Sequence, residues 1–244
     1  MKHVLIMGRP GIGKTVLLKR LAQILRHGPI DGFLTEECRE GAERVGFWLS
    51  PLDGRQILLA HRRMAEGSRI GLYRVNPSVL DEVALGVIRR GVIRARVLFL
   101  DELNRMALSS AALTRAVQDA FDRGPTVVAT AGVAPLAFLT ALKQRRDVEL
   151  IPLSSANREA VAEELTARLR AVCADDEAVQ SVQRQADRIC EMIVSGEVPQ
   201  LDIEIQQAAL RDQIVSLLPD QPALYQLVYE TRFRRLWQQF RTVH

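Results

Sequence analysis

Four residues near the start of the chain have the types and the spacing of a phosphate-binding loop. Gly8, Gly13, Lys14 and Thr15 fit the pattern G-x-x-x-x-G-K-[ST], between a short apolar run and a segment with helical spacing. Glycines let the backbone curl so that its N–H groups point into one concavity, and the following helix adds its unpaired N–H groups. We therefore predict that Lys14 reaches the outer phosphates of a ligand and that the Thr15 hydroxyl binds Mg²⁺.

A second group of polar residues follows later apolar runs. The stretch "VLFLDE" ends in Asp101 and Glu102, and "TVVAT" ends in Thr130. In an open α/β sheet the carboxyl ends of the strands face the ligand crevice. Asp101 is predicted to bind Mg²⁺ indirectly, through the metal's second coordination shell, opposite Thr15. Glu102 is predicted to orient or deprotonate a water. Two acids at a strand end can also be plain turn residues, and Thr130 is either a phosphate or water contact or an ordinary strand residue.

The elements that must position these residues alternate along residues 1–170. Buried β-branched strands that alternate with helices predict βαβ units and a parallel sheet, with an early β-hairpin as an antiparallel excursion. The predicted strands are 4–7, 32–38, 44–50, 56–61, 97–102, 126–132 and 148–153. The predicted helices are 13–27, one that Asn76 caps and Pro77 starts, 109–123, 134–145 and one from about 157.

The chain changes character at about residue 170. Residues 171–244 have helical spacing and no strand candidate, so we predict a helical C-terminal extension to an α/β domain of residues 1–170. The last helix is predicted to start near Pro222. Its apolar face consists of Tyr225, Tyr229, Phe233, Leu236, Trp237 and Phe240. We expect this face to dock on the core with solvated arginines around it; a protein or oligomer interface, nucleic acid and a membrane surface are the alternatives.

Composition and charge limit the class of protein. Apolar residues make up 48% and charged residues 25%, which is a globular balance. The last 14 residues carry four arginines and no acid, so they account for the whole formal net charge of +4. This distribution argues against a body that coats nucleic acid. Neither the three cysteines nor the four histidines have metal-binding spacing, and no apolar run is long enough for a signal peptide or a bilayer span. We interpret the chain as soluble and cytoplasmic, with reduced thiols.

The order of several stretches resembles the thermophile-type nucleoside-triphosphatase family, also called the cancer-related nucleoside-triphosphatase family. The stretches are "GRPGIGKT", "DGFLTEECREGAERVGF", "LYRVNPSVLDE", "LFLDELNRM" and "DVELIPLSSANREAV", over residues 1 to about 168. The resemblance implies a compact P-loop fold and slow, Mg²⁺-dependent hydrolysis of nucleoside triphosphates such as ATP and GTP, with little choice among bases.

The resemblance also implies the nucleotide contacts. The matching residues are Gly8, Arg9, Pro10, Gly11, Ile12, Gly13, Lys14, Thr15, Leu98, Phe99, Leu100, Asp101, Glu102, Leu103, Asn104 and Arg105. Arg105 stands where the family usually has lysine and would be a catalytic cation beside Lys14 and Glu102. The chain departs from the family at Ala107, where an acid is usual, and at Ala131–Gly132, where a histidine or basic run is usual.

Three further arginines are candidates for a role near the phosphates or near a helix start. Arg39 and Arg44 lie in the hairpin stretch and either reach over the phosphates or are solvated turn residues. Arg158, in "ANRE", either has a functional role or caps or braces a helix.

These observations predict an α/β P-loop NTPase with a mostly parallel sheet, flanking helices and a helical extension. Two other hypotheses stay open at this stage. One is a nucleic-acid-linked ATPase or a polynucleotide kinase, although nucleic acid is not favoured as a partner. The other is a nucleotide-dependent binding module with little turnover. A protein partner that binds the C-terminal helix is a separate alternative that also stays open.

Overall fold

The computed structural model describes residues 2–217 and 225–241, without the side chains of 175–179 and 227. Its contacts divide the chain into two compact units, unit 1 up to Cys173 and unit 2 from Ala174. The division falls within a continuous helix, α5 (Arg158–Ser195), close to the boundary after residue 170 that the sequence suggests. We describe each unit by itself.

A mixed sheet forms the centre of unit 1. Within the described residues it has nine strands in the order β5-β6-β4-β3-β2-β7-β8-β1-β9. Their bounds are β1 His3–Met7, β2 Ile30–Glu40, β3 Glu43–Pro51, β4 Ile57–His61, β5 Ser68–Ile70, β6 Tyr73–Val75, β7 Val97–Leu103, β8 Thr126–Ala131 and β9 Val148–Pro152. The strands from β2 to β9 in this order pair in parallel, and β3 to β6 pair antiparallel.

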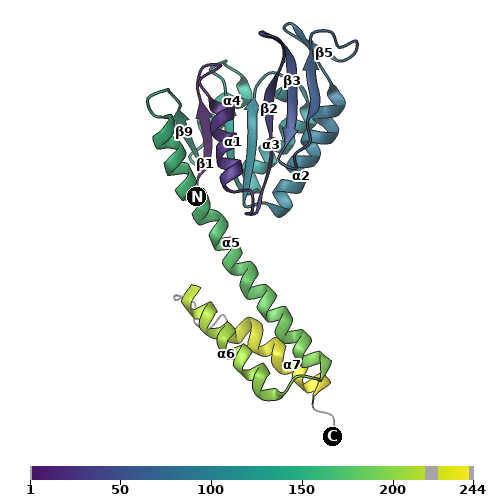
Figure 1. The fold of residues 1–244 in the computed structure, drawn as a ribbon, viewed down its shortest axis with the longest axis vertical. Coiled ribbons are helices and arrows are strands. Elements are labelled where there is room, and N and C mark those ends of the chain that lie inside the picture. The colour runs from purple at the N-terminus through teal and green to yellow at the C-terminus, as the bar shows by residue number, and fades with distance from the viewer. Residues whose placement is uncertain (1, 218–224, 242–244) are drawn as a thin grey trace. The chain divides into compact units, whose positions relative to one another are not determined.

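Helices cover both faces of the parallel part (Figure 1). On one face lie α1 (Lys14–Ile24) and the start of α5, and on the other lie α2 (Leu85–Arg94) and α3 (Ala111–Arg123). The remaining helices of unit 1 are η1 Val79–Ala84, η2 Ala107–Ser109 and α4 Ala137–Lys143. This arrangement explains why the parallel strands read as continuous apolar runs, because both of their faces are buried.

Strand β7 illustrates the two-sided core. Val97 and Phe99 pack in the cluster with α1 and α5, whereas Leu98 and Leu100 pack in the cluster with α2 and α3. Burying one such side chain contributes about 1.5–3 kcal/mol. Because the whole strand is held between two helical layers, the residues that end it, Asp101 onward, are held in a fixed position.

The structure confirms the predicted α/β architecture and differs from the sequence prediction in detail. The hairpin strands extend to Glu40 and Glu43, so its turn is shorter than predicted. The short strands β5 and β6 were not predicted, because three residues each are too few to show a period. Asn76 caps its helix as predicted, since its Oδ1 accepts the N–H of Ser78 at 3.1 Å. The predicted helix start at Pro222 lies outside the described residues.

Unit 2 contains the rest of α5, α6 (Gln200–Leu217), η3 (Gln226–Glu230) and α7 (Thr231–Phe240). Its core includes Ile193, Ile203 and Leu210 together with Tyr225 and Phe233 from the predicted aromatic face. The aromatic face therefore packs within unit 2 itself. None of the described helices of the chain is both long and apolar enough to cross a membrane.

Of the arginines around that face, Arg232, Arg234 and Arg235 are exposed, as predicted, but Arg241 is not simply solvated. Arg241 donates hydrogen bonds to the carbonyls of Ile193, Met192 and Val198 at 3.0, 2.9 and 2.8 Å, and its guanidinium lies over the Trp237 ring. An arginine at the end of a helix can satisfy carbonyls that have no intrahelical partner. Arg241 thus connects the end of α7 to the end of α5.

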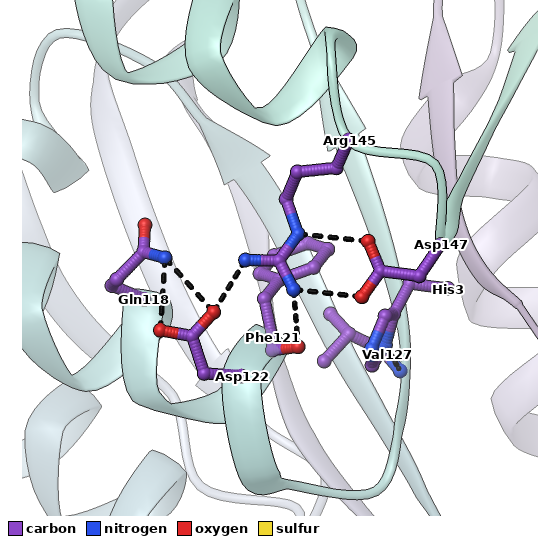
Figure 2. A network of polar contacts seen from close by, with 7 residues as sticks. All are labelled: His3, Gln118, Phe121, Asp122, Val127, Arg145 and Asp147. Atoms are coloured by element: carbon purple, nitrogen blue, oxygen red, sulfur yellow. Dashed lines mark hydrogen bonds and ion pairs between the residues drawn. The ribbon is translucent and has the colours of Figure 1, made fainter.

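A polar network stabilises unit 1 at the edge where β1, β8 and β9 begin (Figure 2). The Arg145 guanidinium donates to Asp147 at 3.0 and 2.7 Å, to the Phe121 carbonyl at 2.9 Å, and to Asp122. These carboxylates raise the pKa of Arg145. Nearby, His3 accepts the N–H of Val127 at 3.0 Å, which requires a neutral ring nitrogen, and burial lowers the pKa of His3 in agreement.

We expect Arg145→Ala to lower the free energy of unfolding of unit 1 by about 1–2 kcal/mol, because it removes charged hydrogen bonds between α3 and the start of β9. Urea unfolding followed by the fluorescence of Trp48, in a Trp237→Phe background, measures this change. The control is Arg146→Ala, which removes the neighbouring exposed arginine. Equal unfolding midpoints of the two variants would contradict the assigned role of the network.

Candidate active site

The predicted phosphate-binding loop lies between the end of β1 and the start of α1. Gly13 has a φ of 99°, a left-handed conformation that favours glycine, and its carbonyl accepts the first helical N–H, from Leu17, at 2.9 Å. A side chain at Gly8 would lie 2.8 Å from Ile12 and 3.2 Å from the Leu153 carbonyl. The two glycines of the motif are therefore required by the backbone path of the loop.

Lys14 lies inside this loop, and its residue is only 7% exposed. Its Nζ donates to the carbonyls of Gly8 at 3.1 Å and Arg9 at 3.3 Å, and lies 3.2 Å from Glu102 Oε1. The ammonium group is therefore oriented across the mouth of the loop, where phosphate oxygens can replace the carbonyls as acceptors.

Asp101 is the most buried charged group of the site, at 0% exposure. Its carboxylate accepts hydrogen bonds from the hydroxyl of Thr15 at 2.7 Å, from the hydroxyl of Thr130, and from the N–H of Thr35 at 3.3 Å. Burial raises the pKa of Asp101, and these hydrogen bonds oppose that rise because they stabilise the charged form. The predicted pair of Thr15 and Asp101 is therefore in direct contact.

Glu102 follows Asp101 at the end of β7 and is about one quarter exposed. Besides its ion pair with Lys14, its Oε1 lies 3.5 Å from the position that a side chain at Gly132 would occupy. Glu102 thus combines a fixed backbone with a carboxylate that faces open space, which is the placement that a water-orienting group needs.

A hollow of about 410 Å³ opens in front of these groups, and we call it the phosphate hollow. It is lined by Pro10, Gly11, Gly13, Lys14, Thr15, Val16, Thr35, Glu36, Glu37, Arg39, Arg44, Phe47, Glu102 and Asn104. The loop, the β2–β3 hairpin and the end of β7 therefore meet at one place, although they are far apart in the sequence.

The two hairpin arginines line this hollow and share one carboxylate. Arg39 donates to Glu37 Oε2 at 2.8 Å, and Arg44 donates to Glu37 Oε1 at 3.0 Å. Arg44 also donates to the Tyr73 hydroxyl at 3.2 Å and lies over the Phe47 ring. From the sequence, these arginines could either reach over the phosphates or be solvated turn residues. The structure places both in the lining of the hollow.

Not every predicted contact lies at the phosphate hollow. Leu98, Phe99, Leu100 and Leu103 are fully buried in the core, so their side chains are not available to a ligand. Arg105 is exposed in the turn after β7 and does not line the hollow. The reason is local geometry, since a strand that is buried on both faces presents only its end to the crevice.

The neighbouring Asn104 does line the hollow, and its side chain accepts the N–H groups of Met106 and Ala107. Of the predicted loop residues, Gly8, Arg9 and Ile12 are outside the lining of the hollow.

Two functional positions, Thr35 and Glu37, were missed by sequence reasoning. Thr35 donates its N–H to the Asp101 carboxylate and its hydroxyl to the Asp101 carbonyl, at 2.6 Å, and Glu37 holds the two arginines. Thr130 binds the buried side of Asp101 and has no exposed surface, so it does not face a ligand. The signal that was available for Thr35 and Glu37 is their place in the distinctive stretch "GFLTEEC".

A larger hollow of about 810 Å³ lies beside α1, β2 and β3. Most of its charged side chains are engaged in ion pairs, including Lys19 with Glu36 at 2.6 Å and Arg90 with Asp31 at 2.7 Å. It has no loop of converging N–H groups in its described lining, so the smaller hollow is the better candidate for phosphate.

The donor set of the phosphate hollow fits a metal that is held mainly by its substrate. Among the described residues, no group of three or more His, Cys, Asp or Glu side chains lies close enough to hold a metal ion. Magnesium commonly uses one or two protein oxygens together with phosphate oxygens and waters. The Thr15 hydroxyl lines the hollow and could be such an oxygen, and the buried Asp101 carboxylate supports it from behind.

Comparisons with known proteins agree with a phosphate-binding site in unit 1, because they match the chain to NTPases over that unit. A family model described as NTPase matches residues 3–166. The chain is 35% identical over 167 residues to nucleoside-triphosphatase THEP1 of Thermotoga maritima, which covers 68% of this chain and 95% of that protein. It is 31% identical over 172 residues to the human cancer-related nucleoside-triphosphatase, which covers 64% and 90%.

Solved structures agree with the sequence matches. The crystal structure of THEP1 from Aquifex aeolicus has a TM-score of 0.60 at 29% identity, covering 67% of this chain and 96% of that one. The solution structure of the human cancer-related enzyme has a TM-score of 0.61 at 28% identity, covering 70% and 98%. Since the family model spans more than half of the sequence and the relatives are matched over nearly their full length, the chain belongs to the NTPase family that this model describes.

Proposed function

We propose that the chain hydrolyses nucleoside triphosphates to nucleoside diphosphate and phosphate in the phosphate hollow. The observation that carries this proposal is the convergence of Lys14, Thr15 and Glu102 on one hollow beside a loop of glycine-supported N–H groups, with the buried Asp101 carboxylate bound to Thr15 behind it. The names of the relatives support the same activity. ATP and GTP are the proposed substrates, and Mg²⁺ is the proposed cofactor.

Each residue of the site has a distinct part in this proposal. The loop N–H groups and Lys14 hold the outer phosphates, and Thr15 with Asp101 would hold Mg²⁺. When bound, Mg²⁺ neutralises charge that develops on the phosphate oxygens. Thr35 and Thr130 keep the Asp101 carboxylate in place, so its negative charge is available next to Thr15.

Glu102 is the proposed group that orients and activates the attacking water. Its ion pair with Lys14 keeps it at the mouth of the loop, 3.2 Å from the ammonium group. Phosphate oxygens compete with Glu102 for Lys14, so ligand binding frees this carboxylate to accept a hydrogen bond from water. Binding and activation of the base are therefore coupled through one lysine.

We assign the catalytic cation to Arg39 and Arg44 rather than to Arg105. Both hairpin arginines line the phosphate hollow opposite the loop, whereas Arg105 does not. Guanidinium groups there can move from Glu37 to the outer phosphate and stabilise the charge of the transition state. The shared carboxylate holds the two side chains ready on the correct side of the hollow.

Lys14→Ala is expected to weaken ATP affinity about 10- to 100-fold, because it removes a charged contact to the phosphates. Calorimetric titration of ATP with Mg²⁺ measures the affinity, and replacing Mg²⁺ by EDTA is expected to weaken wild-type binding as well. The control is Lys19→Ala, which removes an exposed lysine farther along α1. Unchanged affinity in Lys14→Ala would contradict the phosphate assignment.

Glu102→Gln is expected to retain ATP binding and to lower phosphate release by a factor of about 100 or more, because the amide cannot accept a proton from water. Phosphate release from a panel of nucleoside triphosphates measures turnover, with exposed Glu66→Gln as the control. If the wild-type chain released no more phosphate than Glu102→Gln, the binding-module hypothesis would replace the hydrolase.

Arg39→Ala and Arg44→Ala are each expected to lower phosphate release about 10- to 100-fold while ADP affinity changes less than about twofold, because their proposed contact is to the outer phosphate. Arg105→Ala is the matched control and is expected to leave turnover within about twofold. A large loss of turnover in Arg105→Ala, with little loss in the hairpin variants, would show that Arg105 is the catalytic cation.

A further inference from the structure

Arg158, the first residue of α5, lies directly against the phosphate-binding loop. Its Nη1 is 3.1 Å and its Cδ is 3.5 Å from the position that a side chain at Gly13 would occupy. Arg158 is exposed, and in the described part of the chain it makes no ion pair or hydrogen bond. An unpaired guanidinium group is therefore held beside the loop, outside the lining of the phosphate hollow.

The segment that carries Arg158 is firmly positioned. The Asn157 side chain accepts the N–H of Ser154 at 2.8 Å, and the Ser154 hydroxyl accepts the N–H of Asn157 at 3.3 Å. The Asn157 side chain also donates to the Pro152 carbonyl at 2.8 Å. Leu153 donates its N–H to the Met7 carbonyl at 2.7 Å. The loop from β9 to α5 is thus fastened to the end of β1, which leads into the phosphate loop.

An ion pair fixes the first turn of α5 against α1. Arg20 of α1 lies 2.6 Å from Glu159, the residue that follows Arg158. The backbone of Arg158 is therefore held by contacts that do not involve its own side chain. Its guanidinium is free to serve a ligand.

The order of the strands shows which end of a nucleotide Arg158 faces. The outer phosphate is proposed to lie toward Asp101 and Glu102, at the end of β7, and the order β7-β8-β1-β9 puts β9 on the other side of β1. The nucleoside end must then leave the loop away from β7. Val16, in the first turn of α1, is 65% exposed on the way out, and Arg158 begins the helix after β9.

The chemistry of a guanidinium group suits that end of the ligand. It is planar, always charged, weakly hydrated and stacks well on aromatic faces. Every purine and pyrimidine has such a face, so stacking holds a base without reading its hydrogen-bonding edge. An exposed arginine on a rigid support can therefore bind several bases with similar strength.

We propose that Arg158 stacks on the base of the bound nucleotide and forms a base-tolerant nucleoside subsite beside the phosphate loop. This assignment rests on the proposed function, because the nucleotide that Arg158 would bind is the substrate of that function. Arg158 contributes affinity for the nucleoside part and does not take part in the cleavage of the phosphate bond.

The experiment compares ligands with and without a base. Calorimetric titrations with ATP, GTP and inorganic tripolyphosphate, each with Mg²⁺, are made on the wild type, Arg158→Ala and Arg158→Lys. Arg158→Ala is expected to weaken ATP and GTP about tenfold and to leave tripolyphosphate within about twofold. Arg158→Lys is expected to restore little, because an ammonium group keeps the charge and loses the planar surface.

The control is Arg170→Ala, which removes an exposed arginine farther along α5 and leaves Arg158 and its supports unchanged. It is expected to keep the wild-type affinities, and circular dichroism checks that each variant is folded. Equal weakening of tripolyphosphate and ATP in Arg158→Ala would show a phosphate contact and overturn the subsite. Unchanged ATP affinity in Arg158→Ala, or an equal loss in Arg170→Ala, would overturn it too.

Failure of the proposed function has a different signature. A wild-type chain that binds neither ATP nor tripolyphosphate would overturn the proposed function and this subsite together. Tight wild-type binding with any of the three contrary patterns above would overturn the subsite alone.

Discussion

The fully buried carboxylate of Asp101 is the constraint on which the site depends. An ionised carboxylate without partners in a protein interior costs several kcal/mol or more, and hydrogen bonds must offset that cost. The partners of Asp101 are Thr15 of α1, Thr35 of β2 and Thr130 of β8. Satisfying one carboxylate thus fixes a helix start and two strands around the end of β7, and these elements form the site.

The two edges of the parallel sheet, where its strands begin and where they end, have different roles. Strand β1 ends at the phosphate loop, β7 ends at the acid pair and β8 ends next to Thr130. At the opposite edge, β1, β8 and β9 begin next to the Arg145 network. At the beginning, charged groups are paired with one another and tie helices to strands. At the end, Lys14 and Glu102 form an ion pair at the mouth of the phosphate loop, and in the proposed function phosphate competes with Glu102 for the lysine. One edge therefore has its charges satisfied, and the other has charges that a ligand can take over.

The sequence predicted the elements and the linear motifs, because these depend on short-range spacing. The strand–loop–helix around Lys14, the strand that ends in Asp101 and Glu102, and the hairpin are found where expected. It did not predict which side chains of a motif face the ligand. The segment 98–105 matches a motif as a block, yet β7 buries four of its side chains in the core and the exposed Arg105 does not line the hollow. Arg39 and Arg44 reach the hollow through strand pairing over long sequence separations, which spacing alone does not encode.

The helix α5 shows why a boundary between compact units can lack any local signal. Val161, Leu165 and Leu169 pack in the core of unit 1, and Val182, Ile189 and Ile193 pack in the core of unit 2. Helical propensity and hydrogen bonding continue through the junction, so no turn, glycine or proline marks it. The difference across the junction is that the apolar face of α5 packs in the core of unit 1 before it and in the core of unit 2 after it. This difference is a property of tertiary packing. Because residues up to Cys173 supply the α5 part of the unit 1 core, the phosphate loop and its buried supports draw their packing from unit 1. The residues of the candidate site therefore lie within unit 1, and the helix that begins with Arg158 packs in the core of unit 1 before it contributes to the second core.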